Sequence, residues 1–71
     1  MKIEDVKTNL GKTVHYKNKF RLIDHDFKFN AYILQATKNG YSHEAELQDL
    51  KAKGSVFRVP LEDVQEIAIH Q

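Results

Sequence analysis

The stretch that decides the fold is FKFNAYILQATKNG, residues 27–40. Its apolar side chains recur at every second position and many are aromatic or β-branched, which predicts a β-strand over residues 27–37. One face is expected to carry Phe27, Phe29, Ala31 and Ile33, and the other Lys28, Asn30, Tyr32 and Leu34. Because both faces hold apolar side chains, the strand is expected to turn the corner of a small barrel. Asn39-Gly40 readily takes positive φ at both turn positions, so a hairpin is predicted there.

The segment that follows this turn allows two interpretations. Residues 41–48 alternate between apolar and polar side chains, as a return strand should. Ser42 could instead cap a helix over residues 42–53 that stops at Gly54. Pairing within a sheet often overrides helix propensity, so the strand is our prediction and the helix stays the alternative.

Toward the C-terminus, residues 56–59 are predicted to form a further short strand. Pro60 then stands at the first position of a single helical turn that reaches Val64. A last short strand is expected over residues 66–69.

Toward the N-terminus, Ile3, Val6 and Leu10 have helical spacing, which predicts a short helix over residues 1–11 that ends at Gly11.

The chain then changes to the two-residue period of a β-strand. Val14 and Tyr16 are expected to point to one side of a strand that turns near residues 17–19. Phe20 and Leu22 continue the alternation in a second strand, and residues 24–26 (Asp-His-Asp) are expected to break it. The aromatic side chains expected in the core are Phe20, Phe27, Phe29 and Phe57.

Length and composition allow one domain, with the helix at residues 1–11 and a barrel over residues 12–71. The chain has 71 residues, a net charge of +1 and no cysteine, which excludes disulfides, thiolate zinc sites and cysteine nucleophiles. We expect no signal peptide, no membrane span and a cytoplasmic location. Residues 1–38 hold eight basic and four acidic side chains, whereas residues 39–71 hold three and six.

This order of elements resembles the SH3-like small barrels, and among them the Tudor-like ones. The residues that carry the resemblance are Gly11-Lys12-Thr13-Val14, Ala31-Tyr32-Ile33, residues 41–49 and residues 56–67. The chain is also similar to short uncharacterised bacterial proteins, many of them from phages and other mobile elements. The resemblance implies a small five-stranded barrel that serves as a binding module.

Catalysis and metal binding have little support in the sequence. Zinc needs three or four converging ligands, and the four histidines lack pairs at such spacing. Ser42 and His43 are neighbours on a predicted strand and would point to opposite faces, so they cannot form a catalytic pair. We predict no enzyme activity, metal, cofactor or small-molecule substrate.

Two kinds of binding surface remain, and they give the two functional hypotheses. The first is a protein-interaction or adaptor surface, open to self-association, made of apolar positions that a simple barrel leaves outside. Its candidate residues are Leu34, Leu50, Ile67 and Ile69. The alternative is a weak nucleic-acid-binding face, in which rings stack on bases beside cationic side chains. Its candidate residues are Lys12, Lys17, Lys19, Arg21, Lys28, Tyr16 and Tyr32. A Tudor-like pattern also suggests a cage for a methylated cation, with candidates Tyr16, Tyr32 and Tyr41.

Overall fold

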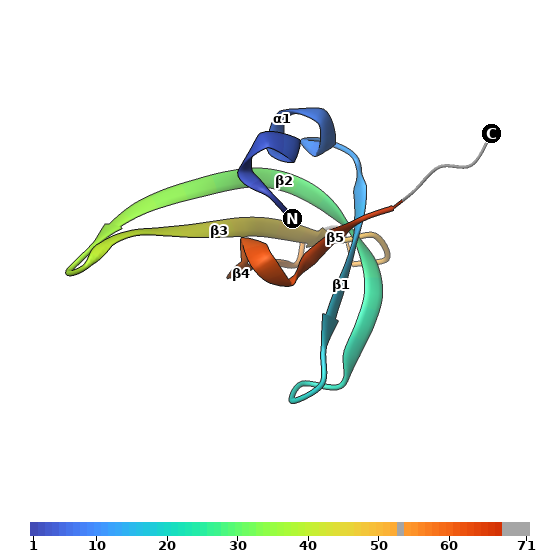
Figure 1. The fold of residues 1–71 in the computed structure, drawn as a ribbon. Coiled ribbons are helices and arrows are strands. Elements are labelled where there is room, and N and C mark those ends of the chain that lie inside the picture. The colour runs from blue at the N-terminus through green and yellow to red at the C-terminus, as the bar shows by residue number, and fades with distance from the viewer. Residues whose placement is uncertain (53, 68–71) are drawn as a thin grey trace.

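Five antiparallel strands form one bent sheet in the computed structural model, which describes residues 1–52 and 54–67 (Figure 1). The elements are η1 (Ile3–Asp5), α1 (Val6–Asn9), β1 (Thr13–Asn18), β2 (Ile23–Thr37), β3 (Gly40–Asp49), β4 (Val56–Pro60), η2 (Leu61–Asp63) and β5 (Val64–Glu66). The strand order in the sheet is β4-β3-β2-β1-β5. The β1–β2 and β2–β3 hairpins extend in different directions from the centre (Figure 1), and the longest dimension of the molecule is 39 Å.

The predicted mainly β fold is confirmed, together with the short N-terminal helix, the single helical turn at η2 and the five strands that the resemblance implied. The separate strand predicted from the alternation of Phe20 and Leu22 is wrong, because those residues lie in a turn. Each strand pairs with its neighbours in the order above, and β4 and β5 stand at the two edges. Among the described residues no pairing joins β4 to β5. The sheet is therefore strongly bent but not closed.

The N-terminal helix lies against one end of the sheet and is held there by polar contacts. The Nδ2 atom of Asn9 donates to the Asp5 carbonyl at 2.8 Å and to Oε1 of Glu66 at 2.5 Å. The Met1 nitrogen donates to the carbonyl oxygens of Leu61 and Val64. These bonds connect the first residues of the chain to η2 and β5.

The core lies on the concave side of the sheet and uses alternate positions of the strands. Its buried residues are Val6, Val14, Tyr16, Phe27, Phe29, Ala45, Leu47, Val59, Leu61 and Val64. Phe57 and Tyr32 are partly buried against this cluster. The prediction that Phe27 and Phe29 belong to the core is confirmed.

A β-bulge corrects the predicted faces of β2. The register shifts between Phe29 and Ala31, so that Tyr32 pairs with Ala45 and lies on the side of the buried residues. Ala31 pairs with Glu46 and therefore lies on the opposite side from Phe29. One extra residue in a strand exchanges the faces of everything beyond it. The predicted single face shared by Phe27, Phe29, Ala31 and Ile33 is therefore wrong after Phe29.

The first hairpin also differs from the prediction. Asn18 pairs with Ile23, the turn occupies residues 19–22, and residues 24–26 form part of β2 rather than a break. Because side chains alternate, a register that buried Leu22 would also have turned Asp24 toward the core. Burial of Phe27 sets the opposite register. Phe20, predicted to be a core residue, is 99% exposed.

The strand predicted for residues 41–48 is confirmed as β3, so the alternative helix over residues 42–53 is wrong. The last strand, β5, begins two residues earlier than predicted and ends at Glu66. Ile69 lies outside the described residues. No helix in the described part of the chain has the length and apolar character needed to cross a bilayer.

Candidate binding site at the β1–β2 hairpin

The turn at the end of the β1–β2 hairpin is held by the side chain of Asn18. Its Oδ1 atom accepts hydrogen bonds from the amides of Phe20 at 2.9 Å and Arg21 at 3.1 Å. Its Nδ2 atom donates to the hydroxyl of Tyr16 at 2.9 Å, and the ring of Tyr16 is buried in the core. Asparagine favours such turns because its side chain can replace backbone partners. The conformation of the turn is thus connected directly to the core.

Leu22 adopts an unusual backbone conformation in this turn. Its φ angle is 56°, and it is the only non-glycine residue with a positive φ among the described residues. A side chain with a Cβ atom is strained in this region, at a cost on the order of 1 kcal/mol. The strain and the Asn18 hydrogen bonds accompany a turn that directs two large apolar side chains into solvent.

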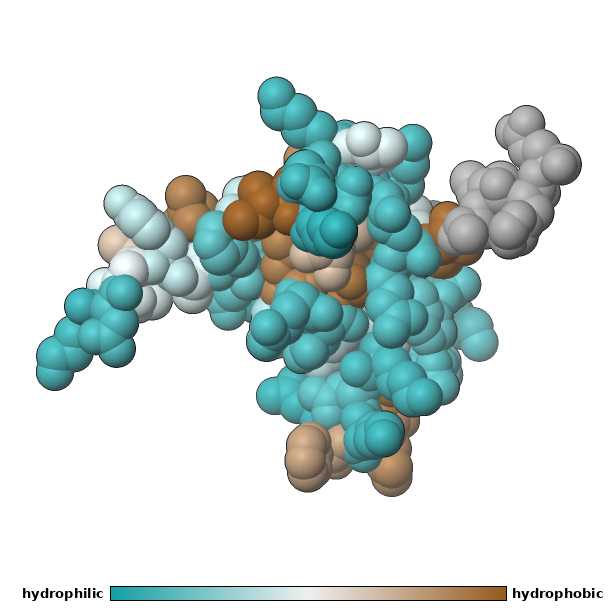
Figure 2. Space-filling model, viewed as in Figure 1, coloured by the Kyte–Doolittle hydropathy of each residue, from teal (hydrophilic) through white to brown (hydrophobic). Residues whose placement is uncertain are grey.

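Those two side chains are the most exposed large apolar groups of the described protein. Phe20 is 99% exposed and Leu22 is 90% exposed. Figure 2 shows hydrophobic atoms at the lower end of the molecule, where this hairpin ends, below a hydrophilic surface. Side chains of Lys17, Lys19 and Arg21 alternate with them, and residues 17–23 contain no carboxylate. We call residues 17–22 the hairpin tip: an apolar pair among three cations.

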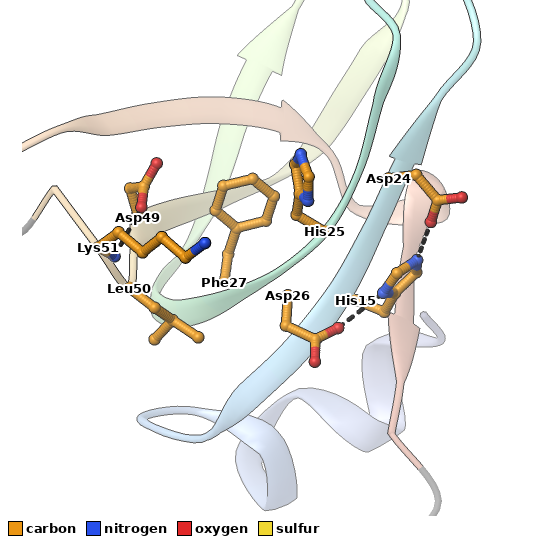
Figure 3. Close-up of a pocket in the computed structure, with 8 residues that line it drawn as sticks. All are labelled: His15, Asp24, His25, Asp26, Phe27, Asp49, Leu50 and Lys51. Carbon is orange, nitrogen blue, oxygen red and sulfur yellow. Dashed lines mark hydrogen bonds and ion pairs between the residues drawn. The ribbon is translucent and has the colours of Figure 1, made fainter.

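Farther along the same hairpin, the outward face carries a histidine between two carboxylates. The Nδ1 atom of His15 lies 2.7 Å from Oδ1 of Asp26, and its Nε2 atom lies 2.5 Å from Oδ1 of Asp24 (Figure 3). Both ring nitrogens can donate to carboxylates only when the imidazole is protonated. These hydrogen bonds raise the pKa of His15 above its ordinary value of 6.5, and the bond to Asp26 has the larger effect.

An open pocket of about 460 Å³ lies beside this cluster, between β2 and the loop after β3 (Figure 3). Its lining residues are His15, Asp24, His25, Asp26, Phe27, Asp49, Leu50 and Lys51. Asp49 accepts the amides of Lys51 and Ala52, and these bonds lower the pKa of its carboxyl. Within residues 1–52 and 54–67, no group of three or more histidine, aspartate or glutamate side chains is arranged to hold a metal ion.

The structure divides the residues predicted for nucleic-acid binding. Lys17, Lys19 and Arg21 come together at the hairpin tip, whereas Lys12 and Lys28 lie at the opposite end of β1. Five residues of strand separate these two groups, or about 17 Å. The His15 cluster, with its two carboxylates, lies between them. The cationic side chains therefore do not form one continuous track.

Two of the predicted rings are not available for stacking at the hairpin tip. Tyr16 is 1% exposed, so its ring is a core residue and cannot contact a base or a methylated cation. The sequence predicts Tyr16 as a stacking ring because cationic residues lie near it along the chain, but in the structure its ring packs edge-on against Phe27 and Phe57. Tyr32 lies in the β2–β3 hairpin, where its ring stacks on His43. It does not share a face with Lys28, because the bulge intervenes.

The predicted protein-interface residues lie in separate places. Leu34 is 55% exposed near the end of the β2–β3 hairpin, Leu50 lines the pocket described above, and Ile67 lies beside the end of α1. Leu34 pairs with His43, and Leu50 follows the residue that pairs with Phe27, so about 20 Å of strand separates them. They are exposed, as expected, but they do not gather on one surface.

Sequence reasoning missed the most exposed apolar pair, because Phe20 and Leu22 continue the alternation of a buried strand. The signal that could have revealed them was the pair of aspartates, Asp24 and Asp26, at the next positions of the same alternation.

No protein-family model, no curated protein and no solved structure matches this chain.

Proposed function

We propose that the protein is a non-enzymatic binding module that docks onto a partner protein through the hairpin tip. The observation that carries the proposal is the exposure of Phe20 and Leu22 on a turn fixed by hydrogen bonds. Burying each of these side chains in a partner would contribute roughly 1.5–3 kcal/mol before the costs of association. Because Asn18 already orders the turn, little conformational entropy would be lost on binding.

The charges of the hairpin tip define the partner surface. Lys19 and Arg21 alternate with the apolar pair along the turn, and Lys17 lies just before it, so the complementary site is an apolar pocket with an acidic rim. Such charges mainly increase the association rate and select the partner, whereas the buried apolar pair supplies most of the affinity. Substitution of the cations should thus change salt dependence, and substitution of Phe20 should change the dissociation rate.

The strand order supports the SH3-like barrel, which is part of this proposal. The order β4-β3-β2-β1-β5, with a helical turn between β4 and β5, is the order expected of an SH3-like barrel. In this proposal the bent sheet is an open form of that barrel. Binding modules of this kind use the loops and hairpins that extend from the sheet.

Nucleic-acid binding is the second candidate function, and one observation favours it. Phe20 lies between Lys19 and Arg21 in the sequence of the turn, which is the combination of ring and cation used for single strands. A protruding β-hairpin can also insert an apolar wedge into a duplex. Against this, Asp24 and Asp26 lie close to the same hairpin, and the cations form two separate groups.

A photo-crosslinking experiment tests the proposal. Phe20 is replaced by p-benzoylphenylalanine in the cells that naturally produce the protein, and the adducts are identified by mass spectrometry. Tyr41, which is 69% exposed at the end of the other hairpin, is the matched control position. We expect a specific protein adduct at position 20 that is lost when Leu22 is changed to Ser, and no such adduct at position 41.

Other results would contradict the proposal. An adduct that nuclease treatment removes, and that salt suppresses steeply, would transfer support to nucleic-acid binding. Equal adducts at the two positions would show that the hairpin tip has no special role.

A further inference from the structure

The β2–β3 hairpin extends beyond the rest of the sheet as a two-stranded arm. β1 accompanies β2 only as far as Lys28, and the chain before β1 makes its last backbone bonds to β2 at Phe29. β4 accompanies β3 only from Glu44 onward. Over residues 31–37, β2 pairs with β3 alone among the described residues. Figure 1 shows this arm reaching away from the body of the molecule.

The free edge of β2 lacks every device that normally protects an edge strand. Residues 31–37 read AYILQAT and contain no charged residue, proline or glycine. Proteins usually protect such edges with charges, prolines or bulges, because the unpaired backbone groups accept another strand. The bulge in β2 lies before this segment, between Phe29 and Ala31. The edge is therefore suited to pairing with a further strand.

We infer that two copies of this chain pair antiparallel along residues 31–37 of β2, about a twofold axis at Leu34. Each arm is marginal as an isolated pair of strands, whereas the dimer joins the two arms into a four-stranded sheet. Pairing of seven residues provides roughly seven backbone hydrogen bonds, which is within the range of about 10 ± 5 found at protein interfaces. This inference is independent of the docking of the hairpin tip.

The side chains fit a second copy of the same strand. Around the axis, Leu34 lies beside its own copy, Tyr32 beside Ala36, and Ile33 beside Gln35. Each large side chain has an apolar or smaller neighbour across the interface, and Leu34 is 55% exposed in the single chain. A twofold interface must be self-complementary, and this uncharged segment meets that requirement.

The charges of the neighbouring strand also permit the dimer. Glu44 pairs with Ile33 in β3, one strand away from the proposed interface. In the joined sheet the two copies of Glu44 lie three strand spacings apart, or about 14 Å. This distance exceeds the screening length of about 8 Å at physiological salt, so their repulsion is weak.

Sedimentation analysis over a wide range of protein concentration tests the inference. The wild-type protein should form a reversible dimer. Leu34→Lys and Leu34→Glu each place two like charges beside the twofold axis, and each should weaken the dimer at least roughly tenfold. An equimolar mixture of the two variants should restore dimers, because Lys and Glu then face each other.

Two control variants separate this interface from the other exposed surfaces. Tyr41→Lys alters an exposed side chain of the same arm, on β3, and should leave the dimer unchanged. A double change of Phe20 and Leu22 to Ser should also leave it unchanged, since the hairpin tip lies elsewhere. A wild-type protein that stays monomeric would overturn the inference. So would a dimer that is insensitive to both Leu34 variants, or a mixture that remains monomeric.

Discussion

The histidine between two carboxylates makes the stability of this small protein depend on pH. His15 lies on β1, and Asp24 and Asp26 lie on β2, so their contacts connect the two strands of the first hairpin. Replacing His15 with Gln removes the charge of the imidazolium and keeps a polar side chain of similar length. The two aspartates then face each other without a cation between them.

The expected magnitude follows from the exposure of the three side chains. The His15 side chain is 29% exposed, whereas those of Asp24 and Asp26 are 60% and 49% exposed. Ion pairs at such positions contribute about 0.2–1 kcal/mol each, because solvent screens them. Two of them together should contribute about 1 kcal/mol. In a chain of this length, such a change moves the melting temperature by roughly 4–8 °C.

The sign follows from the direction of the pKa shift. Folding raises the pKa of His15 above 6.5, so the folded state binds the proton more tightly than the unfolded state. The stabilisation is complete below the unfolded pKa of about 6.5 and is lost as the pH rises through the higher folded pKa. The free energy of unfolding of the wild type, relative to His15→Gln, should therefore fall by about 1 kcal/mol between mildly acidic and alkaline pH.

Urea denaturation followed by circular dichroism at a series of pH values measures this difference. His25→Gln is the matched control: His25 lies on β2 between Asp24 and Asp26 in sequence, and its ring packs edge-on against Phe27. Among the described residues it forms no ion pair like those of His15, and its electrostatic effect on Asp49 is a minor one. We expect this variant to retain the pH dependence of the wild type. If the free energies of unfolding of the wild type and His15→Gln instead change in parallel with pH, Asp24 and Asp26 do not stabilise the protonated His15. NMR titration of the His15 ring gives the folded pKa independently.

Two further predictions concern the first hairpin. Tyr16→Phe removes the hydroxyl that accepts a hydrogen bond from Asn18, and should reduce the free energy of unfolding by about 0.5–1.5 kcal/mol. Tyr16→Ala leaves a cavity in the core and should reduce it by about 3–5 kcal/mol. Urea denaturation of both variants checks this order, and equal losses would contradict it. Leu22→Gly relieves the positive φ and should raise stability by about 0.5 kcal/mol, because the greater entropy of unfolded glycine offsets part of the relieved strain. Leu22→Ala keeps the strain and should show no gain in thermal denaturation; a gain equal to that of glycine would argue against strain.

Much of the fold could be predicted because hydrophobic periodicity and turn residues are local signals. The alternation after residue 40 and the Asn39-Gly40 pair predicted the β2–β3 hairpin, and the structure has it. The turn itself lies one residue earlier than predicted: Gly40 pairs with Thr37, residues 38–39 form the turn, and Asn39 does not take the expected positive φ. Pro60 predicted the helical turn before the last strand, and the structure has this turn one residue later, at Leu61–Asp63, with Pro60 as the last residue of β4. Gly11, with φ of 81°, ends the N-terminal helix as expected.

The errors arose where two apolar patterns competed for the same core. Phe20 and Leu22 have the alternation of a buried strand, and so does the set that contains Phe27. Only one set can face inward, because a strand exposes alternate residues to opposite sides. The bulge after Phe29 has no strong local signal either, since it depends on how β2 fits against β3.

In the candidate sites, too, some features follow from the local sequence and others only from tertiary packing. The cations of the hairpin tip are plain in the sequence, but whether an aromatic ring beside them is buried depends on tertiary packing. That packing buried Tyr16 and exposed Phe20. The sequence by itself determined most of the strands, the position of the second hairpin and the lack of charge in residues 31–37, because these depend on neighbours along the chain. Only the tertiary structure decided which rings reach solvent and that His15 lies between Asp24 and Asp26, because those outcomes depend on the register between strands.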